Sequence, residues 1–299
     1  MSDVTPDWIA VDWGTSNMRA WAMSASGTVL AEARSDKGMG ELARDEFETE
    51  LLRTVGDWIS GPTTVVACGM VGSRQGWVEA PYASVPCPAL PDGLARAPVQ
   101  NPDLQVHVIP GIKQTDPADV MRGEETQIAG FLALNKNWDG GICLPGTHTK
   151  WVHVSADEVV SFQTFMTGEL FATISQQTVL RHSLATEGWD DDAFSNAVEE
   201  AMARPERLAA RLFSLRADGL LNDLSAVSAR ARLSGLLIGA ELAAAKPYWL
   251  GQQIAVIGAS GISKRYVDAL ALLHAPATQV QASAITVAGL TAAYQRLKG

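Results

Sequence analysis

Residues 9–21 read Ile-Ala-Val-Asp-Trp-Gly-Thr-Ser-Asn-Met-Arg-Ala-Trp, and this stretch decides the fold. An apolar run reaches an acid, turns through glycine and hydroxyl residues, and leaves through alternating apolar positions, a pattern typical of a β-hairpin. Gly14 lets the backbone approach a ligand closely, and the N–H groups around Thr15 and Ser16 can bind a phosphate. Asp12, at the end of the first strand, is suited to hold a hydrated Mg²⁺. The alternative is an ordinary glycine turn.

A second stretch repeats this pattern in the other half of the chain. Residues 142–144 predict a strand, residues 145–150 a glycine and hydroxyl turn, and residues 151–154 the strand that leaves it. Lys150 can neutralise charge on a phosphoryl group in transfer, and phosphate oxygens can be bound by Gly146, Thr147, His148 and Thr149. For His148 the alternative is a plain polar loop residue. Two such turns are what a nucleotide cleft between similar domains requires, so we expect domains 1–138 and 139–299.

Strands and helices alternate along the chain. Apolar residues recur at helical spacing over 47–59, and an apolar strand follows at 65–68. Residues 81–118 are rich in proline and lack periodicity, which predicts an irregular excursion around one strand, before a helix that begins near Asp119. The second half is mainly helical over 168–245, with breaks expected at Gly188, Pro205 and Gly219. A strand at 254–257, a helix through 266–270, a short strand ending at Val280 and a closing helix at 285–297 are expected after it. The alternation predicts an α/β fold with mostly parallel sheets and ligands at their carboxyl edges.

Two adjacent acids, Glu124 and Glu125, stand at a predicted helix start. Acidic residues there gain from the helix dipole, and one of them could accept a proton from an attacking hydroxyl. The alternative is a pair of solvated acids that stabilise the first turn. Sequence leaves open which of the two is the base, because one residue of helix phase decides it.

An acceptor with an acid group needs polar side chains in the first half of the chain. Arg74 is the first candidate for its carboxylate, since a guanidinium matches a carboxylate bidentately, and Arg122 is the second. The same glycine-broken loop carries Gln75, Trp77 and Tyr82. For the two aromatic residues the alternative is burial in the core. A further glycine turn suits close approach of adenosine through Gly258, Ser260 and Gly261.

Composition excludes several classes of protein. The 299 residues are 47% hydrophobic and 19% charged, which is typical of a globular chain. A net charge of -10 and a pI near 5.0 argue against nucleic acid as a partner. We expect no membrane span and no signal peptide, because no apolar run is long enough and the start is acidic. The three cysteines lack metal-binding spacing, which predicts reduced thiols in a cytoplasmic protein.

The hairpin at Asp12 resembles the first phosphate loop of the actin-like ATPase and sugar kinase superfamily. Within it, the chain resembles the 2-dehydro-3-deoxygalactonokinase family over nearly its whole length, and the matching strings lie at 11–16, 72–77, 122–127, 144–151 and 167–170. The resemblance implies a two-domain actin-like fold with an interdomain cleft and phosphorylation, by ATP with Mg²⁺, of the C6 hydroxyl of 2-dehydro-3-deoxy-D-galactonate. Many superfamily members carry an Asp before the second loop, where Cys143 and Leu144 stand here, so Asp12 is the clearer acid for the metal.

Three other functions stay open at this level. A kinase for another sugar or sugar acid would differ only in the acceptor loop. An exopolyphosphatase-type phosphohydrolase also carries a Gly-Glu-Glu string at a helix start, and a nucleotide-gated filament protein could use the same fold. Self-association is open too, since the alanine-rich segments 236–245 and 284–293 could pack against a partner or against each other.

Overall fold

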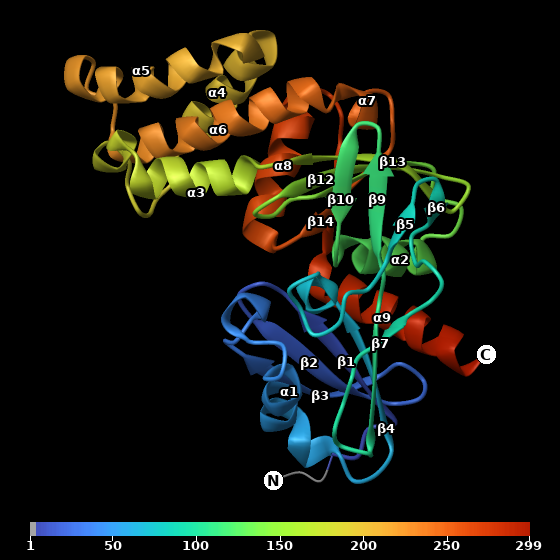
Figure 1. Ribbon diagram of the computed structural model, residues 1–299. Helices are drawn as coiled ribbons and strands as arrows, with labels where there is room; N and C mark the ends of the chain where they lie inside the picture. Colours follow the sequence, from blue (N-terminus) through green and yellow to red (C-terminus); the bar gives the residue numbers. More distant parts are fainter. Residues whose placement is uncertain (1–3) are drawn as a thin grey trace. The chain divides into compact units, whose positions relative to one another are not determined.

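The computed structural model describes residues 4–299, which fall into two compact units (Figure 1). Unit 1 contains the described residues up to Trp138 together with 154–161 and 282–299, and unit 2 contains 139–153 and 162–281. The sequence division assigned all of 139–299 to one domain. In the structure the closing helix α9 (Ala282–Lys298) packs instead on α2 (Glu124–Leu134) of unit 1. Glycine allows this contact, because a Cβ on Gly130 would lie 2.0 Å from the carbonyl oxygen of Ile285.

Unit 1 is built on a six-stranded sheet of order β3-β2-β1-β4-β8-β7. Its first three strands are antiparallel neighbours, and β1, β4 and β8 are parallel. Their bounds are β1 (Trp8–Trp13), β2 (Met18–Met23), β3 (Val29–Ser35), β4 (Thr63–Cys68), β7 (Ala95–Arg96) and β8 (Leu104–Val108). The short helices are η1 (Met39–Glu41), α1 (Phe47–Val55), η2 (Gly56–Trp58) and η3 (Met70–Gly72). Three antiparallel strands followed by parallel strands, with helices between them, form the α/β arrangement that the sequence predicts.

The hairpin expected at Asp12 is present. Asp12 pairs with Arg19 and Trp13 with Met18, and the Gly14 N–H donates to the Asn17 carbonyl at 2.9 Å. A neighbouring segment supports the turn, because Met39 N–H donates to the Gly14 carbonyl at 2.9 Å. The turn is therefore an ordered loop that presents exposed Thr15 and Ser16.

The prediction for residues 81–118 was wrong in part. The segment contains, besides β7 and β8, the strands β5 (Tyr82–Ser84), β6 (Cys87–Pro88), β9 (Gly111–Thr115) and the start of β10 (Ala118–Met121). Strands β10, β9 and β5 form a three-stranded sheet. Strands of two to five residues are too short to show a period in a proline-rich sequence. Because β10 continues to Met121, α2 begins at Glu124 and not near Asp119.

Unit 2 repeats the plan with a sheet of order β15-β14-β11-β12-β13, and β6 pairs with the start of β13. Its strands are β11 (Gly140–Leu144), β12 (Thr149–Ser155), β13 (Glu158–Phe165), β14 (Ile254–Gly258) and β15 (Ala277–Gln281). The helices are α3 (Thr167–Gln177), η4 (Val179–His182), α4 (Asp191–Ala203), η5 (Pro205–Arg207), α5 (Leu208–Leu221), α6 (Ala226–Ala244), α7 (Lys246–Trp249) and α8 (Ser260–Leu272).

One expectation about these helices fails. Gly219 does not break a helix, since α5 runs through it to Leu221. The two alanine-rich segments belong to α6 and α9, which lie in different units and pack on α4 and α2. On α6 a Cβ at Gly235 would lie 2.4 Å from the Phe194 carbonyl oxygen, so small residues bring α6 and α4 close together.

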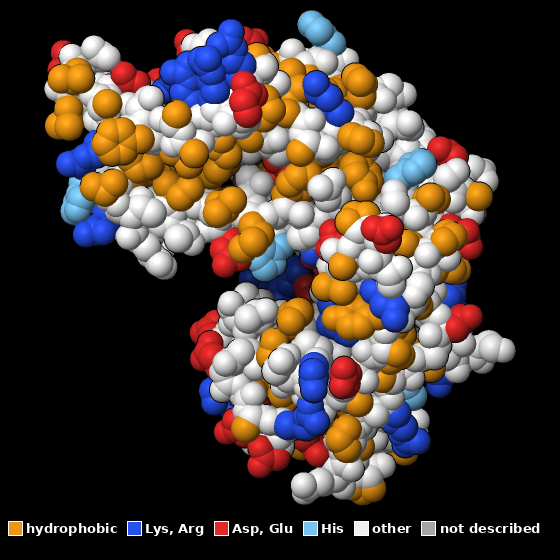
Figure 2. Space-filling view, turned by 45° about the horizontal axis from the view of Figure 1, so that its top comes forward, with side chains coloured by type: hydrophobic (Ala, Val, Ile, Leu, Met, Phe, Trp, Pro, Cys, Tyr) orange, Lys and Arg blue, Asp and Glu red, His pale blue; other side chains and the backbone are white. Residues whose placement is uncertain are grey.

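Hydrophobic side chains gather on the helical part of unit 2 (Figure 2). The large exposed ones on α3 and α5 include Leu170, Phe213, Leu220 and Leu221. Exposed apolar patches commonly mark contact surfaces, and self-association stays a prediction. Among the described residues, no helix combines the length and apolar character needed to cross a bilayer.

Candidate active site

Three segments of unit 1 meet at Asp12. Its carboxylate accepts a hydrogen bond from Arg19 Nη2 at 2.7 Å, and Cys68 Sγ lies 3.9 Å from its other oxygen. Gly69 and Gly123 both have positive φ angles, +93° and +107°, and a Cβ on Gly123 would lie 3.3 Å from the Gly69 Cα. Glycine at both positions therefore lets the start of α2 lie directly against the end of β4.

Asp12 fits a magnesium ion that is bound mainly by water and phosphate. Within residues 4–299, no group of three or more His, Cys, Asp or Glu side chains could hold a metal. Mg²⁺ commonly keeps several waters and takes one or two carboxylates, and the carboxylate of half-buried Asp12 fits this role.

Glu124 and Glu125 lie in different environments. Glu125 is fully buried, accepts hydrogen bonds from Gly123 N–H at 2.7 Å and Thr126 Oγ1 at 3.1 Å, and lies next to the Glu124 charge. Burial, and then the Glu124 charge, raise the pKa of Glu125 to about 8. Glu124 is half-buried, and its Oε2 accepts from Arg122 N–H at 3.0 Å. Glu124 is therefore the more accessible carboxylate of the pair.

Arg122 lies under the loop that was predicted to bind the acceptor. Its guanidinium donates to the Ala80 carbonyl at 2.8 Å and to Tyr82 Oη at 3.3 Å, and lies 4.2 Å from the Tyr82 ring centroid. Arg122 is 9% exposed, and its Nη1 has no hydrogen-bond partner. The hydroxyl of buried Ser73 also lacks a partner, and a Cβ on the adjacent Gly72 would lie 2.9 Å from Arg122 Nη1. Two unsatisfied donors thus belong to one part of unit 1.

The other predicted acceptor residues lie elsewhere. Arg74 and Gln75 are exposed, and the Arg74 carbonyl accepts from Arg44 Nη2. Trp77 is a core residue: it is 3% exposed, packs on Phe47 and Trp13, and donates its Nε1–H to the Pro98 carbonyl. The structure thus gives Trp77 the core position that was the alternative for it, because the apolar ring fills the core beneath the loop.

In unit 2 the second glycine turn is held against the start of α3. Residues 145–148 connect β11 to β12, and the Glu169 N–H donates to the Thr147 carbonyl at 2.9 Å. His148 Nε2 lies 2.6 Å from Glu169 Oε2, and a Cβ on Gly168 would lie 2.2 Å from the Gly146 carbonyl oxygen. The exposed turn residues Gly146 and Thr147 therefore lie beside a helix N-terminus, a favourable place for an anion.

The last two residues of this motif are buried in β12. Thr149 is 1% exposed, and its Oγ1 hydrogen-bonds Tyr266 Oη at 3.0 Å, so it is not placed to donate to a phosphate as predicted. Lys150 is 6% exposed, and its Nζ donates to Thr164 Oγ1 at 2.8 Å. The regular strand begins at Thr149, so the side chains of Thr149 and Lys150 point to opposite faces of the sheet, and both are buried because both faces are covered there.

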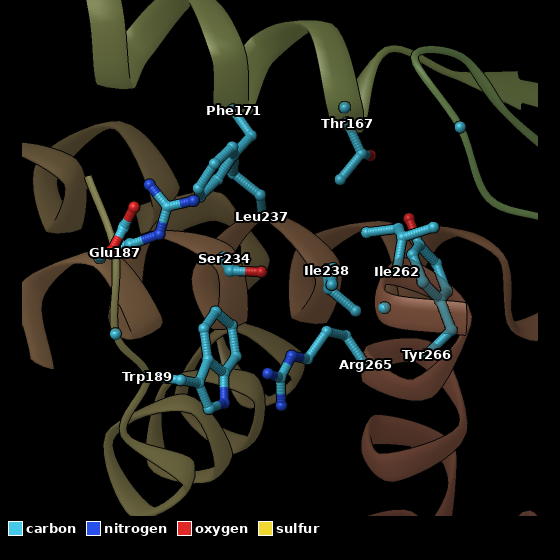
Figure 3. A pocket seen from close by; sticks show the side chains of 15 residues that line it. Thr167, Phe171, Glu187, Trp189, Ser234, Leu237, Ile238, Ile262, Arg265 and Tyr266 are labelled. Carbon is cyan, nitrogen blue, oxygen red and sulfur yellow. The ribbon is translucent and has the colours of Figure 1, made fainter. Parts of the chain in front are cut away.

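A cavity of about 530 Å³ in unit 2 begins at this turn (Figure 3). Its glycine end is formed by Gly146, by Gly168 in the first turn of α3, and by Gly261 in the first turn of α8. Its apolar walls come from α3, α6, α8 and the loop before α4, and include Phe171, Leu237, Ile238, Ile262 and Trp189. Two helix N-termini at one end and aromatic walls at the other suit a nucleotide, with its phosphates and its base respectively.

Two arginines are stacked on the aromatic residues of the cavity. The Arg265 guanidinium carbon lies 3.6 Å from the Trp189 ring centroid, and both side chains line one wall in Figure 3. Arg230 lies 5.2 Å from the Phe171 ring centroid and donates to the Ala185 carbonyl. These planar groups offer stacking surfaces for a base.

The predicted adenosine turn is only partly at this cavity. Gly261 lines it, whereas the Ser260 hydroxyl is hydrogen-bonded to Gln281. A Cβ on Gly258 would lie 2.6 Å from Ser263 Oγ and 3.3 Å from the Pro145 carbonyl oxygen, so Gly258 serves packing under the second turn. Sequence reasoning missed Phe171, Arg230, Trp189 and Arg265. Trp189 could have been noticed because it follows the predicted break at Gly188. The other three are single residues within helices, where no motif marks them.

A glycine turn and helix N-termini at an apolar cavity, together with a carboxylate and an unsatisfied guanidinium donor at strand ends of unit 1, suit a phosphotransferase. Comparison with known proteins agrees with this class. The model of the 2-keto-3-deoxy-galactonokinase family matches residues 12–293. The chain belongs to that family.

Relatives match over nearly the full chain. A probable 2-dehydro-3-deoxygalactonokinase, DgoK1, from Rhizobium meliloti (strain 1021) is 41% identical, with 95% of each chain covered. A 2-dehydro-3-deoxygalactonokinase from Escherichia coli (strain K12) is 33% identical over 96% of this chain and 97% of its own length. The crystal structure of a Sinorhizobium meliloti protein assigned as a 2-dehydro-3-deoxygalactonokinase superposes with a TM-score of 0.89, at 37% identity, covering 97% of this chain and 96% of that one.

Proposed function

We propose that this chain transfers the terminal phosphoryl group of ATP to the C6 hydroxyl of 2-dehydro-3-deoxy-D-galactonate. Membership of the family and the names of its relatives support the reaction class and the substrate. The observation that carries the proposal is the buried Arg122 guanidinium, which makes no salt bridge with any carboxylate of residues 4–299. A buried cation without an anion is costly, and a sugar-acid carboxylate is a ligand that compensates it.

The Arg122 guanidinium and the Glu124 carboxylate could bind the two ends of one acceptor molecule, its carboxylate and its reacting hydroxyl. The Glu124 carboxylate lies at the backbone N–H of Arg122, while the guanidinium lies at the far end of the same side chain, beside Ala80 and Tyr82. An extended arginine side chain and a six-carbon acid are similar in length. We therefore assign the carboxylate and keto end to Arg122 and Ser73, and the reacting hydroxyl to Glu124 as base.

The nucleotide belongs to the cavity of unit 2. Its base would lie among the aromatic walls, and its phosphates at Gly146 and the first turns of α3 and α8. Lys150 stays a predicted catalytic residue, and Thr164 holds its ammonium group. Asp12 would hold Mg²⁺, which when bound neutralises charge on the phosphates. The predicted cleft between the domains also stays a prediction, as does a cytoplasmic location, which three buried free thiols support.

The test is ADP formation from ATP with Mg²⁺ against a panel of acceptors. The panel contains 2-dehydro-3-deoxy-D-galactonate, its gluco epimer, neutral hexoses and a reaction without acceptor. We expect turnover with the galactonate-derived acid and none with neutral hexoses, because they leave the Arg122 charge unpaired. Phosphate release without acceptor, or turnover with hexoses alone, would contradict the assignment.

A further inference from the structure

Glu241, in the middle of α6, is a buried carboxylate that the proposed reaction does not use. It is 3% exposed and accepts hydrogen bonds from Trp151 Nε1 at 2.7 Å, from Tyr266 Oη at 2.9 Å and from Thr167 Oγ1. No Lys, Arg or His of residues 4–299 forms a salt bridge with it. Three neutral donors from three different elements thus hold one carboxylate.

The partners of Glu241 connect it to the nucleotide cavity. Thr167 and Tyr266 both line the cavity, and Thr167 is the first residue of α3, adjacent to the Gly168 that packs on the second glycine turn. Figure 3 shows Thr167 and Tyr266 on the side of the cavity away from Glu187 and Trp189. Tyr266 Oη also hydrogen-bonds Thr149 Oγ1 on β12. One carboxylate therefore connects α6 to α3 through Thr167, to α8 through Tyr266 and to β12 through Trp151.

Stability alone is a poor reason for this arrangement. Removing a carboxylate from water without a cation is expensive, and an apolar side chain of similar size commonly serves packing better. Burial raises the pKa of Glu241 to about 7, against the hydrogen bonds of its three donors. The Glu241 carboxylate contacts both the first turn of α3, at Thr167, and α8, at Tyr266, so it fixes the position of one helix relative to the other.

We propose that Glu241 is a positioning residue for the nucleotide: its carboxylate holds Thr167 and Tyr266 so that the first turn of α3 and the wall of α8 fit the phosphates. The proposal rests on the assignment of the unit 2 cavity to ATP. Glu241 acts on the nucleotide only through Thr167 and Tyr266, which line the cavity. A change at Glu241 should therefore alter the affinity for the nucleotide and not the affinity for the acceptor.

Protonation of Glu241 should then weaken nucleotide binding. A protonated carboxyl group offers one acceptor oxygen fewer than a carboxylate, so one of its three donors loses its partner. The groups that face Glu241 are Trp151 from β12, Thr167 from α3, and Tyr266 from α8, with Cys143 of β11 nearby. Burial raises the pKa values of Tyr266 and Cys143 well above their usual range, so both stay neutral between pH 6 and 8.5 and Glu241 alone titrates.

The experiment measures ADP binding by isothermal titration calorimetry for wild type, Glu241→Gln and Tyr266→Phe. Tyr294→Phe is the matched control, since it makes the same change at a buried tyrosine of unit 1.

At pH 8.5 we expect Glu241→Gln to weaken ADP binding about tenfold and Tyr266→Phe about threefold, since each removes one or two hydrogen bonds. As the pH falls to 6, the ratio of the Kd for ADP of Glu241→Gln to that of wild type should approach one, because protonated glutamate resembles glutamine. Titration of the ADP phosphates is common to all variants and cancels in this ratio.

Wild-type affinity for ADP in both Glu241→Gln and Tyr266→Phe would overturn the proposal, as would an affinity ratio that does not change with pH. If Glu241→Gln does not fold, Tyr266→Phe decides, and an unchanged ADP affinity there overturns it. A wild type that binds no ADP would overturn the proposed function as well. ADP binding by wild type with unaffected variants would overturn only the role of Glu241.

Discussion

Neighbouring residues with the same side chain differ at this site because their environments differ. Glu124 is half-buried at the start of α2, whereas Glu125 points into the core of unit 1 and has a pKa raised to about 8 by burial. A base must reach the hydroxyl of its substrate, and only Glu124 has access to solvent. Glu125 at pH 7 is mainly a neutral acid that accepts from the backbone N–H of Gly123.

Glu124→Gln should therefore lower kcat about 100- to 10,000-fold, the usual contribution of a general base. Glu125→Gln should have a much smaller effect at pH 7, because glutamine reproduces a neutral side chain of the same shape. Steady-state kinetics of the two variants with the sugar acid checks this order. The reverse order would assign the base to Glu125.

Arg122→Lys should raise the KM for the sugar acid at least about tenfold, with little change in the KM for ATP. A lysine keeps the charge but loses the planar fork and its stacking on Tyr82. Arg74→Lys is the matched control and should leave both KM values near wild type, since Arg74 is exposed. Acceptor KM values that respond only to Arg74 would restore the original sequence-based choice.

At the scale of elements, close contact at glycines positions the second phosphate turn. The first turn of α3 lies so near residues 145–148 that Gly168 has no room for a side chain. The glycine in α5 is different, because a Cβ on Gly219 would meet only the Leu224 carbonyl oxygen at 3.7 Å.

Gly168→Ala should push α3 away from the Gly146 turn and weaken ADP binding, whereas Gly219→Ala should not. In an exposed helix interior, alanine is favoured over glycine by about 0.8–1 kcal/mol, so Gly219→Ala should raise the free energy of unfolding slightly. Calorimetric ADP titrations and thermal unfolding of both variants check the pair. Full ADP affinity in Gly168→Ala would show that this turn does not hold the phosphates.

At the scale of the whole molecule, two buried acids make stability depend on pH. The pKa values of Glu125 and Glu241 in the folded state are about 8 and about 7, above the usual 4.5. Between pH 4.5 and these pKa values, the two carboxyl groups are mainly ionised in the unfolded chain and mainly protonated in the folded chain. Stability is therefore greatest at the acidic end of this window and falls as the pH rises.

Glu125→Gln should flatten this decline by up to about 1.4 kcal/mol per pH unit between pH 5 and 8, the slope of one titrating proton. Urea unfolding of wild type and variant at several pH values measures it. An unchanged slope would mean that Glu125 is ionised in the folded protein.

Local sequence was enough for the parts that depend on neighbouring residues. Membership of the sugar-acid kinase family was expected from the resemblance of five motif strings, and the family model confirms it. The hairpin at Asp12 and the second glycine turn at Gly146 follow from periodicity and turn chemistry. The same reasoning failed over 81–121, where strands are too short to show a period, and at Gly219, where a helix tolerates glycine.

Sequence by itself determined the two glycine turns and the α/β plan, because these depend on contiguous residues, and its family resemblance indicated the class of reaction. Only the tertiary structure decided that Glu125 and Thr149 are buried, that Trp77 belongs to the core, and that α9 returns to unit 1. It also assembled the unit 2 cavity from α3, α6, α8 and the loop at Trp189. Such features depend on which distant elements pack against a side chain, and packing sets burial, pKa and access, which no local pattern contains.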